Sequence, residues 1–399
     1  MDKNEKLLYL LQYVKAHNPY YKDTLANEQL GTVEDAINCL ANMKPINKDI
    51  LLNHYEELIS DEINPDDLLW EYTSGTTGKP LKIGKTVKER SEAAFKLMKW
   101  RNKHFGVQLA ENYAYFTTIA KDKKYVIDRN ILFMSEINLD DESFDLYYKL
   151  MVEKEVKWMF STPSVTYLLM NYLKRNNKEI PSLRYIELTG EQMLPEEKAK
   201  FSEFFKCNVA EQYGIRELWA IAKECKAGQL HLLENDILLE NWGPKGIYVT
   251  ALNQYAMPII KYYVEDEIEE GPACSCGCSY KTIKIKKSRA LEFLYIGKDR
   301  VISPILLRIC LTRIKNQYGI NIGQFQYIQD EYDGVKCYIQ YDDNYSVEEI
   351  KEKLVEAINQ LYPLPDGFNV TVIKVDSLLP AMKRGKLGYF ISHLKKVEM

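Results

Sequence analysis

The segment from Glu71 to Ile83 constrains this chain more than any other. Its sequence, EYTSGTTGKPLKI, places two threonines between two glycines and follows them with a lysine. The glycines let the backbone approach a ligand closely, and the Ser and Thr hydroxyls can donate hydrogen bonds to an anion. The lysine adds a point charge suited to phosphate. The segment predicts a phosphate-binding loop of Thr73, Ser74, Gly75, Thr76, Thr77, Gly78 and Lys79.

This loop differs from a Walker A loop, which has four residues between its glycines and a Ser or Thr after the lysine. Here two residues separate Gly75 from Gly78, and Pro80 follows the lysine. The flanking residues 68–70 and 81–83 read as short strands, so we expect no helix N-terminus behind the loop. The alternative is a Thr- and Gly-rich hairpin without a ligand.

The overall composition indicates a globular protein of two domains. The chain has 399 residues, of which 46% are hydrophobic and 28% charged, with a net charge of −4. This balance gives no sign of nucleic-acid binding. We find no apolar run of membrane-spanning length and no signal peptide at the N-terminus. We therefore expect a cytoplasmic protein whose eight cysteines are reduced.

The order of predicted elements indicates an α/β fold. Strands at 113–119 and 156–160 alternate with helices at 143–153 and 195–205, as in layered α/β domains. Residues 231–264 are rich in β-forming residues and turns, and 290–399 read as a small α+β domain. We expect a large N-terminal layered α/β domain with a β-rich subdomain over 1–287, and a small mobile C-terminal lid domain over 288–399.

The string YTSGTTGKP at 72–80 resembles the phosphate-loop signature of the adenylate-forming superfamily. HNPYY at 17–21 and MKPINKDIL at 43–51 resemble its phenylacetate–CoA ligase branch. The resemblance extends over roughly 17–388. It implies the adenylate-forming enzyme fold, ATP as substrate and Mg²⁺ as cofactor.

EQYGIRE at 211–217 resembles the YGxTE motif of the superfamily. The resemblance implies that Glu217 holds Mg²⁺ beside the ATP phosphates and that Tyr213, followed by Gly214, stacks on adenine. A carboxylate suits this task because Mg²⁺ prefers oxygen ligands. Arg216 stands where the family has a threonine that contacts the α-phosphate, and its charge could replace that contact.

GIYVTALNQYAMPIIKYYVED at 246–266 is the longest matching block. It implies that Asp266 accepts hydrogen bonds from both ribose hydroxyls, which suits a two-oxygen acceptor. Gly190 and Glu191 resemble the short turn that packs beside adenine and the acyl pocket. The alternative for this pair is an ordinary turn between a strand and a helix.

Two residues near the C-terminus are assigned by resemblance. Lys386, in LPAMKRGK at 379–386, resembles the lysine that reaches the substrate carboxylate and the α-phosphate; the alternative is a basic tail. Arg289, in SRALE at 288–292, is the candidate hinge. The residues after Arg289 depart from the CoA-using pattern and are closer to capsule-biosynthesis relatives of the branch. Adenylation is therefore better supported than thioester formation.

A cysteine and histidine pattern predicts a metal site. Cys225 and His231 are followed by CSCGC at 274–278. Thiolate and imidazole are the ligands that structural Zn²⁺ prefers, in sets of four. The spacing resembles the set found in the phenylacetate–CoA ligase branch. We name Cys225, His231, Cys274 and Cys276 as ligands, with Cys278 as a rival; free thiols in a loop are the alternative.

The sequence thus predicts an ATP- and Mg²⁺-dependent ligase that activates a carboxylic acid as acyl-AMP. The branch suggests an aromatic or short acyl acid. The acyl acceptor could be CoA, a carrier protein or another nucleophile, and the assembly a monomer or homodimer. A complete acid–CoA ligase is one alternative. A degenerate nucleotide-binding protein without turnover is another, motivated by Arg216, Ala381 and the altered hinge.

Overall fold

The computed structural model describes residues 1–72, 81–117, 123–136, 139–191, 195–241, 246–287, 294–297, 301–302, 304–376 and 390–394. The predicted phosphate loop at 73–79, the hinge candidate Arg289 and the predicted catalytic Lys386 lie outside the described residues. The chain divides into two compact units. Unit 1 contains the described residues within 1–110 and 210–289, and unit 2 those within 111–209 and 290–399.

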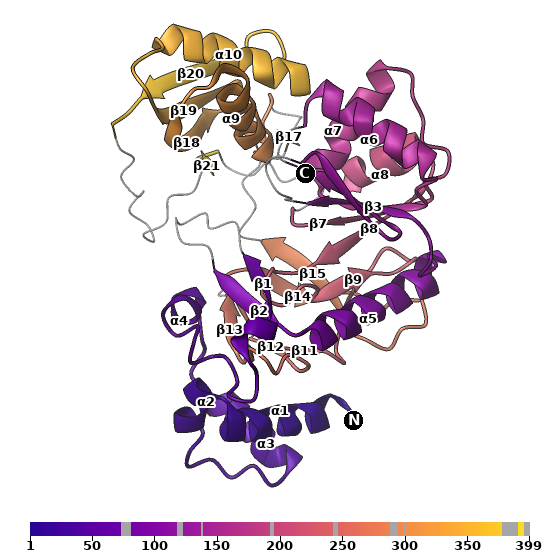
Figure 1. Cartoon of the computed structure of the whole chain (residues 1–399), viewed down its shortest axis with the longest axis vertical. Coiled ribbons are helices and arrows are strands. Elements are labelled where there is room, and N and C mark those ends of the chain that lie inside the picture. The colour runs from indigo at the N-terminus through magenta and orange to yellow at the C-terminus, as the bar shows by residue number, and fades with distance from the viewer. Residues whose placement is uncertain are drawn as a thin grey trace. The chain divides into compact units, whose positions relative to one another are not determined.

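Unit 1 begins with four helices, α1 (Lys3–His17), α2 (Pro19–Thr24), α3 (Val33–Asn42) and α4 (Lys48–Asn53) (Figure 1). Local sequence explains where they start. The Asp2 side chain accepts from the backbone N–H of Glu5 in a capping box that opens α1, and Asn18 caps α2 ahead of Pro19. Leu7, Leu8, Leu11 and Val14 recur at helical spacing along α1; Leu8 is half-buried and the other three are buried.

The strands described in unit 1 come from two parts of the chain, 69–85 and 208–287. The short helix η1 (Pro65–Asp67) precedes the hairpin of β1 (Leu69–Tyr72) and β2 (Lys82–Lys85), which leads into α5 (Val87–Phe105). β8 (Asn208–Tyr213) pairs at its end with β9 (Ala222–Glu224), and β10 (Leu230–Leu232), β15 (Thr282–Lys287) and β14 (Glu267–Glu270) continue that sheet. A second sheet has the order β11 (Ile237–Glu240), β12 (Ile247–Ala251), β13 (Tyr262–Val264).

In unit 2, a mostly parallel sheet carries the alternation that the sequence predicts. Its strand order is β7 (Tyr185–Thr189), β6 (Trp158–Ser161), β3 (Tyr113–Thr117), β5 (Ile131–Ser135), β4 (Tyr125–Asp128), with β4 antiparallel to β5. The helices are α6 (Asp141–Glu153), α7 (Pro163–Arg175) and α8 (Pro195–Phe205). Parallel strands are joined by helical connections that cover the sheet, and this confirms the layered α/β prediction.

The described residues from 294 onward form an α+β arrangement, as expected. It contains β16 (Leu294–Tyr295), β17 (Val301–Ile302), α9 (Ile305–Tyr318), β18 (Ile322–Glu331), β19 (Gly334–Tyr341), α10 (Val347–Leu361), β20 (Asn369–Lys374) and β21 (Phe390–Ser392). The main sheet has the order β20-β19-β18-β21. Ser346 and Glu349 form the capping box that opens α10. The domain boundary between 287 and 288 stays a prediction.

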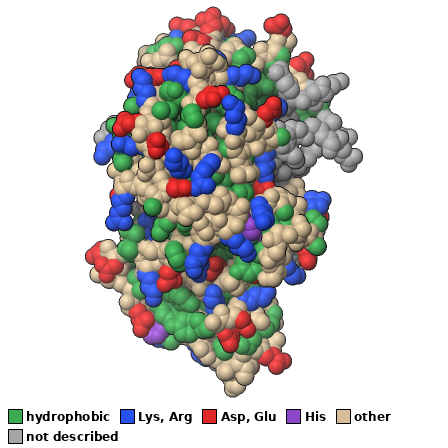
Figure 2. Space-filling view, turned by 90° about the vertical axis from the view of Figure 1, so that its right-hand side faces the viewer, with side chains coloured by type: hydrophobic (Ala, Val, Ile, Leu, Met, Phe, Trp, Pro, Cys, Tyr) green, Lys and Arg blue, Asp and Glu red, His purple; other side chains and the backbone are tan. Residues whose placement is uncertain are grey.

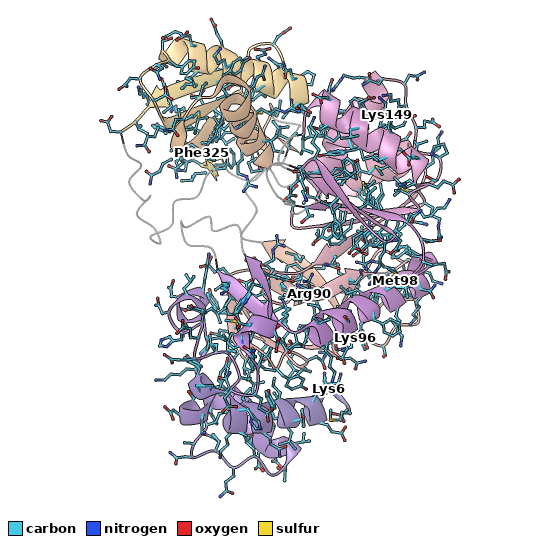
Figure 3. The ribbon with its side chains drawn as sticks, in the orientation of Figure 1. Lys6, Arg90, Lys96, Met98, Lys149 and Phe325 are labelled. Atoms are coloured by element: carbon cyan, nitrogen blue, oxygen red, sulfur yellow. The ribbon has the colours of Figure 1, made fainter. Side chains whose placement is uncertain are left out.

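Charge is well mixed where the surface is visible. On the face shown in Figure 2, Lys and Arg side chains lie among Asp and Glu side chains, unlike the basic stripe of a nucleic-acid-binding protein. In unit 1, Lys6 of α1 and Lys96 of α5 both reach Asp236, with Nζ to Oδ1 distances of 4.0 and 2.5 Å (Figure 3). Among the described helices, none combines the length and apolar composition that a membrane span needs.

Lys261, in the MPIIKYY string, joins the N-terminal helices to the β-rich part of unit 1. It is 6% exposed, and its ammonium donates to the carbonyls of Leu40 and Ala41, both at 2.7 Å. These carbonyls belong to the last turn of α3, where a cation also suits the helix dipole. Ile46 then bridges to Tyr262 of β13.

We expect Lys261→Met to destabilise the protein by about 2–3 kcal/mol, because two buried hydrogen bonds from a charged donor would be lost. A lower urea midpoint, followed by tryptophan fluorescence, would measure this. Lys3→Met is the matched control. Its side chain is 43% exposed and pairs with Glu234, so we expect a cost below about 1 kcal/mol. Equal midpoints for the two variants would contradict the role of Lys261.

Candidate functional site

The turn between β8 and β9 forms the centre of the candidate site in unit 1. Trp219 N donates to the Ile215 carbonyl at 2.7 Å, and Ile221 N donates to the Tyr213 carbonyl at 2.8 Å. A Cβ at Gly214 would lie 1.7 Å from the Trp219 carbonyl oxygen. Glycine is therefore required at this position, because any side chain would collide with backbone.

Tyr213 and Asp266, which the sequence assigns to the nucleoside, lie together. The Tyr213 hydroxyl donates to Asp266 Oδ2 at 2.7 Å, across 53 residues of chain. Tyr213 ends β8, and Asp266 lies between β13 and β14; both are buried. A carboxylate has about four acceptor sites, so Asp266 can hold the tyrosine and still accept from the hydroxyls of a ligand.

Glu217 is buried, with 5% of its surface exposed, and is held by a partner that the sequence analysis missed. The Tyr262 hydroxyl donates to Glu217 Oε1 at 2.9 Å. Tyr262 is fully buried in β13, whose burial alternates. The residue types of Tyr262-Tyr263-Val264 do not alternate, so the sequence carries no signal that would single out Tyr262. The contact joins the two matching blocks at 211–217 and 246–266.

A second group next to the turn was also missed, and it consists of Glu71, Lys85 and Trp219. The Trp219 indole N–H donates to Glu71 Oε2 at 2.6 Å, and Lys85 Nζ lies 3.2 Å from the same oxygen. Burial lowers the pKa of Lys85, while the charges of Glu71, Glu217 and Glu89 act to raise it. The Lys85 ammonium lies 5.0 Å from the Trp219 ring centre.

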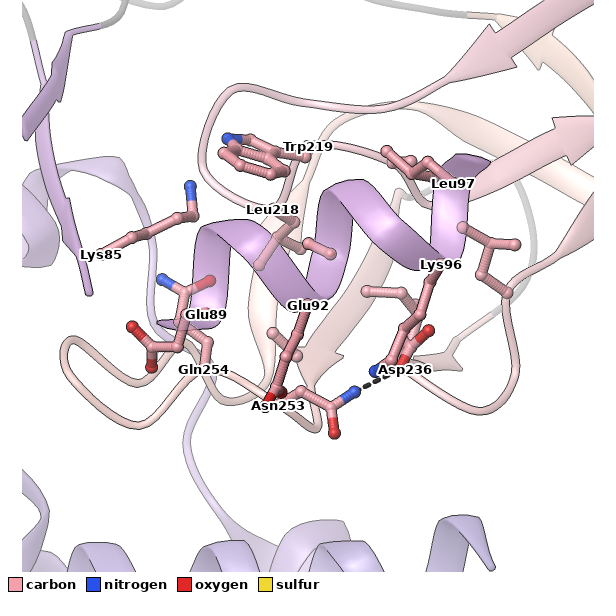
Figure 4. Close-up of a pocket in the computed structure, with 15 residues that line it drawn as sticks. Lys85, Glu89, Glu92, Lys96, Leu97, Leu218, Trp219, Asp236, Asn253 and Gln254 are labelled. Carbon is pink, nitrogen blue, oxygen red and sulfur yellow. Dashed lines mark hydrogen bonds and ion pairs between the residues drawn. The ribbon is translucent and has the colours of Figure 1, made fainter. Parts of the chain in front are cut away.

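A cavity of about 100 Å³ lies beside this group, between α5 and the loops that follow β8, β10 and β12 (Figure 4). Lys85, Leu218 and Trp219 contribute to its lining near the turn. Farther along α5, the cavity is lined by Lys96 and Asp236, which form an ion pair. The cavity thus borders the same turn that carries Glu217.

Arg216 belongs to unit 1, and the pair Gly190–Glu191 belongs to unit 2. The Arg216 side chain is exposed, and its carbonyl accepts from Lys85 Nζ at 3.5 Å. In unit 2, Glu191 accepts from the backbone N–H and hydroxyl of Ser164, in the first turn of α7, where a carboxylate suits the helix N-terminus. The predicted role of the pair beside adenine stays a prediction.

The four predicted metal ligands form one cluster. The ligand atoms of Cys225, His231, Cys274 and Cys276 all lie within 4.8 Å of one another. The Cys225 and Cys274 sulfurs are 3.5 Å apart, and the Cys276 sulfur is 3.4 Å from His231 Nε2. A tetrahedral site with Zn–S bonds of about 2.3 Å has edges of about 3.8 Å, so these distances fit. Cys278 lies outside the cluster.

Two hydrogen bonds to backbone carbonyls position Cys225 and His231 in this cluster. Cys225 directly follows β9, and its N–H donates to the Gln229 carbonyl at 3.0 Å, which closes the turn into β10. His231 is fully buried in β10. Its Nδ1 lies 2.9 Å from the Tyr280 carbonyl, so Nδ1 carries the proton. This outer contact leaves Nε2 as the ligand atom toward the sulfurs.

The chain was compared with protein-family models, curated proteins and solved structures. Residues 11–236 match the family model described as AMP-binding enzyme. No curated protein matches the sequence. Among solved structures, 2-hydroxyisobutyryl-CoA ligase in the postadenylation state with 2-HIB-AMP matches at a TM-score of 0.62 and 12% identity, over 98% of this chain and 88% of that chain. The same ligase with 2-HIB-AMP and CoA, in the thioesterification state, matches at 0.62 and 15%, with the same coverage. At these identities the likeness concerns the fold, and it confirms the expected architecture.

Proposed function

The chain belongs to the AMP-binding enzyme family, and we propose that it activates a small carboxylic acid as acyl-AMP, using ATP and Mg²⁺. A carboxylate oxygen of the acid attacks the α-phosphorus in line. The bond between the α-phosphorus and the bridging oxygen breaks, and pyrophosphate leaves with the electron pair. As in other phosphate chemistry, catalysis depends on positioning and on stabilising developing charge.

The observation that carries this proposal is the meeting of two sequence blocks in unit 1. Tyr213 and Glu217 come from the first block, and Tyr262 and Asp266 come from the second. They are joined by hydrogen bonds of 2.7 Å between Tyr213 and Asp266 and 2.9 Å between Tyr262 and Glu217. An aromatic ring, a carboxylate for hydroxyls and a second carboxylate for a cation are what a magnesium nucleotide requires.

Each residue then has a defined task. The Tyr213 ring stacks on adenine, and Asp266 accepts from the ribose hydroxyls. Glu217 supplies a carboxylate oxygen to Mg²⁺, which when bound neutralises charge on the phosphates. Residues 73–79 hold the leaving phosphates, and Arg216 contacts the α-phosphate. Lys386 offsets the charge on the α-phosphate, Arg289 is the hinge, and Gly190 with Glu191 borders adenine. Acid-dependent formation of acyl-AMP from ATP, detected by mass spectrometry, tests this assignment.

For the second step we propose CoA as the first acceptor to examine. The fold is that of a ligase whose structures include one with CoA, whereas residues 288–292 depart from the CoA-using pattern. Adding CoA to the reaction and measuring acyl-CoA separates the possibilities. Thioester formation supports a complete acid–CoA ligase. Accumulation of acyl-AMP alone indicates a carrier protein or another nucleophile as acceptor.

We further propose that Cys225, His231, Cys274 and Cys276 bind a structural Zn²⁺. Three sulfurs and one imidazole form a closed four-ligand set of the kind found in structural sites. The ion would connect the β9–β10 turn to the loop between β14 and β15. All four residues belong to unit 1, so the ion would hold these strand connections together.

We expect the purified protein to contain about one equivalent of zinc, and Cys276→Ser to lower this below about half, because a structural site needs all four ligands. Elemental analysis measures both values. Cys278→Ser is the matched control, since it makes the same change two residues away and should retain the metal. Equal zinc loss in the two variants, or less than about half an equivalent in the parent protein, would contradict the assignment.

A further inference from the structure

The Trp219 backbone has an unusual conformation. Its φ is +66°, in the left-handed region that bulky residues rarely occupy. Such a conformation persists only where the surroundings determine it, and it often marks a functional turn. Trp219 is two residues after Glu217, in the turn whose other end has no room for a Cβ at Gly214.

The contacts of the indole and of Lys85 show what holds the turn. The Trp219 indole N–H donates to Glu71 Oε2 at 2.6 Å. Lys85 Nζ joins the same oxygen at 3.2 Å and the Arg216 carbonyl at 3.5 Å. The turn is thus fixed at two points, one on each side of Glu217, by side chains from β1 and β2.

The ion pair of Glu71 and Lys85 is largely buried, and it restricts the backbone beside Glu217. The Lys85 side chain is 6% exposed and that of Glu71 is 13% exposed. A buried ion pair is weak evidence for stability, because desolvation offsets much of the attraction. Its geometry does, however, restrict the backbone on both sides of Glu217. Figure 4 shows Lys85 directed toward the turn that carries Leu218 and Trp219.

We propose that Glu71, Lys85 and Trp219 are positioning residues that hold the 214–219 turn so that Glu217 presents its carboxylate to nucleotide-bound Mg²⁺. This inference rests on the proposed function. It assigns a role to Glu71, which is two residues before the predicted phosphate loop, and it makes the β1–β2 hairpin the support of the magnesium ligand. The three side chains act through Glu217 and need not touch the nucleotide.

Trp219→Phe tests the proposal, because it keeps an aromatic ring and removes the indole N–H. Changes to residues that orient a metal ligand typically weaken metal binding about tenfold or more. Without any acid present, we expect the Mg²⁺ concentration for half-maximal Mg²⁺-dependent ATP binding, measured by calorimetry, to rise about tenfold. The Mg²⁺ midpoint for acyl-AMP formation should rise by the same factor, with kcat at saturating Mg²⁺ changed less than about threefold. Trp100→Phe is the matched control. It removes an indole N–H that donates to the Glu224 carbonyl at 2.8 Å, away from the turn.

A second variant separates positioning from general loosening of the fold. Glu71→Met removes the acceptor of the Trp219 indole N–H. Because Trp219→Phe removes the other half of that bond, the effects of the two changes on the Mg²⁺ midpoint should not add. Three results would overturn the proposal: an unchanged midpoint in Trp219→Phe, an equal shift in Trp100→Phe, or full additivity of the double variant. If the parent protein itself forms no acyl-AMP with any acid, the proposed function fails, while the Mg²⁺ midpoint for ATP binding still tests the inference.

Discussion

Glu217→Gln is expected to lower kcat for acid-dependent acyl-AMP formation by about a hundredfold or more, because loss of one charged group at the phosphates removes transition-state stabilisation. The amide keeps the shape of the side chain and can still accept from Tyr262, which donates to Glu217 Oε1 at 2.9 Å. The fold should therefore persist, and the loss should fall on kcat and on Mg²⁺ dependence.

Two further variants make this expectation quantitative. Tyr262→Phe leaves the charge of Glu217 in place and removes only its hydrogen bond, so we expect a fall of roughly tenfold. Glu142→Gln, at a side chain that is 85% exposed, should match the parent protein. Initial rates over a series of Mg²⁺ concentrations measure all three. Activity of Glu217→Gln within about threefold of the parent would exclude Glu217 as the magnesium ligand.

Gly214→Ala is expected to have the second large effect, on stability and activity together. The added Cβ would lie 1.7 Å from the Trp219 carbonyl oxygen, 2.7 Å from its carbonyl carbon and 3.1 Å from the Ala220 Cα. All three are backbone atoms, so no side chain can turn aside to relieve the contact. The turn must move, and with it both Tyr213 and Glu217. We expect a cost of about 3 kcal/mol or more, at the upper end for overpacking.

The measurement combines a melting curve with the rate of acyl-AMP formation. If a Gly214→Ala protein remains folded, its rate of acyl-AMP formation should be about a hundredfold lower, because the Glu217 carboxylate would be displaced from the position where it binds Mg²⁺. Gly31→Ala is the matched control. Its added methyl group would meet its nearest atom, Asp35 Oδ2, at 3.6 Å, which is ordinary contact, so little change is expected. A Gly214→Ala protein that melts with the parent would contradict the described turn.

The sequence predicts features that are encoded locally. The helix from 346 to 362 could be predicted because Ser346 and Glu349 form a capping box within four residues. The layered α/β class follows from the alternation of strands and helices at 113–205. The grouping of Cys225, His231, Cys274 and Cys276 could be predicted from the spacing and its resemblance to the branch, and the four side-chain atoms do lie together.

Contacts between distant side chains could not be predicted in this way. Tyr262 and Glu217 are 45 residues apart, and Trp219 and Glu71 are 148 apart. No periodic pattern links such pairs, because their approach depends on how separate strands are placed. The positive φ of Trp219 is equally absent from the sequence, since tryptophan gives no signal for the left-handed region. The sequence places Lys261 within the matching block at 246–266, but it does not predict the hydrogen bonds to two carbonyls of α3.

We propose above all that this protein makes acyl-AMP from ATP and a carboxylic acid. Exchange of labelled pyrophosphate into ATP, across a panel of aryl, amino and short-chain acids, tests it most directly because the assay needs no acyl acceptor. We predict exchange that depends on at least one acid and on Mg²⁺, and that Glu217→Gln abolishes. ATP binding without exchange for every acid in the panel would contradict the account and would indicate a nucleotide-binding protein without turnover.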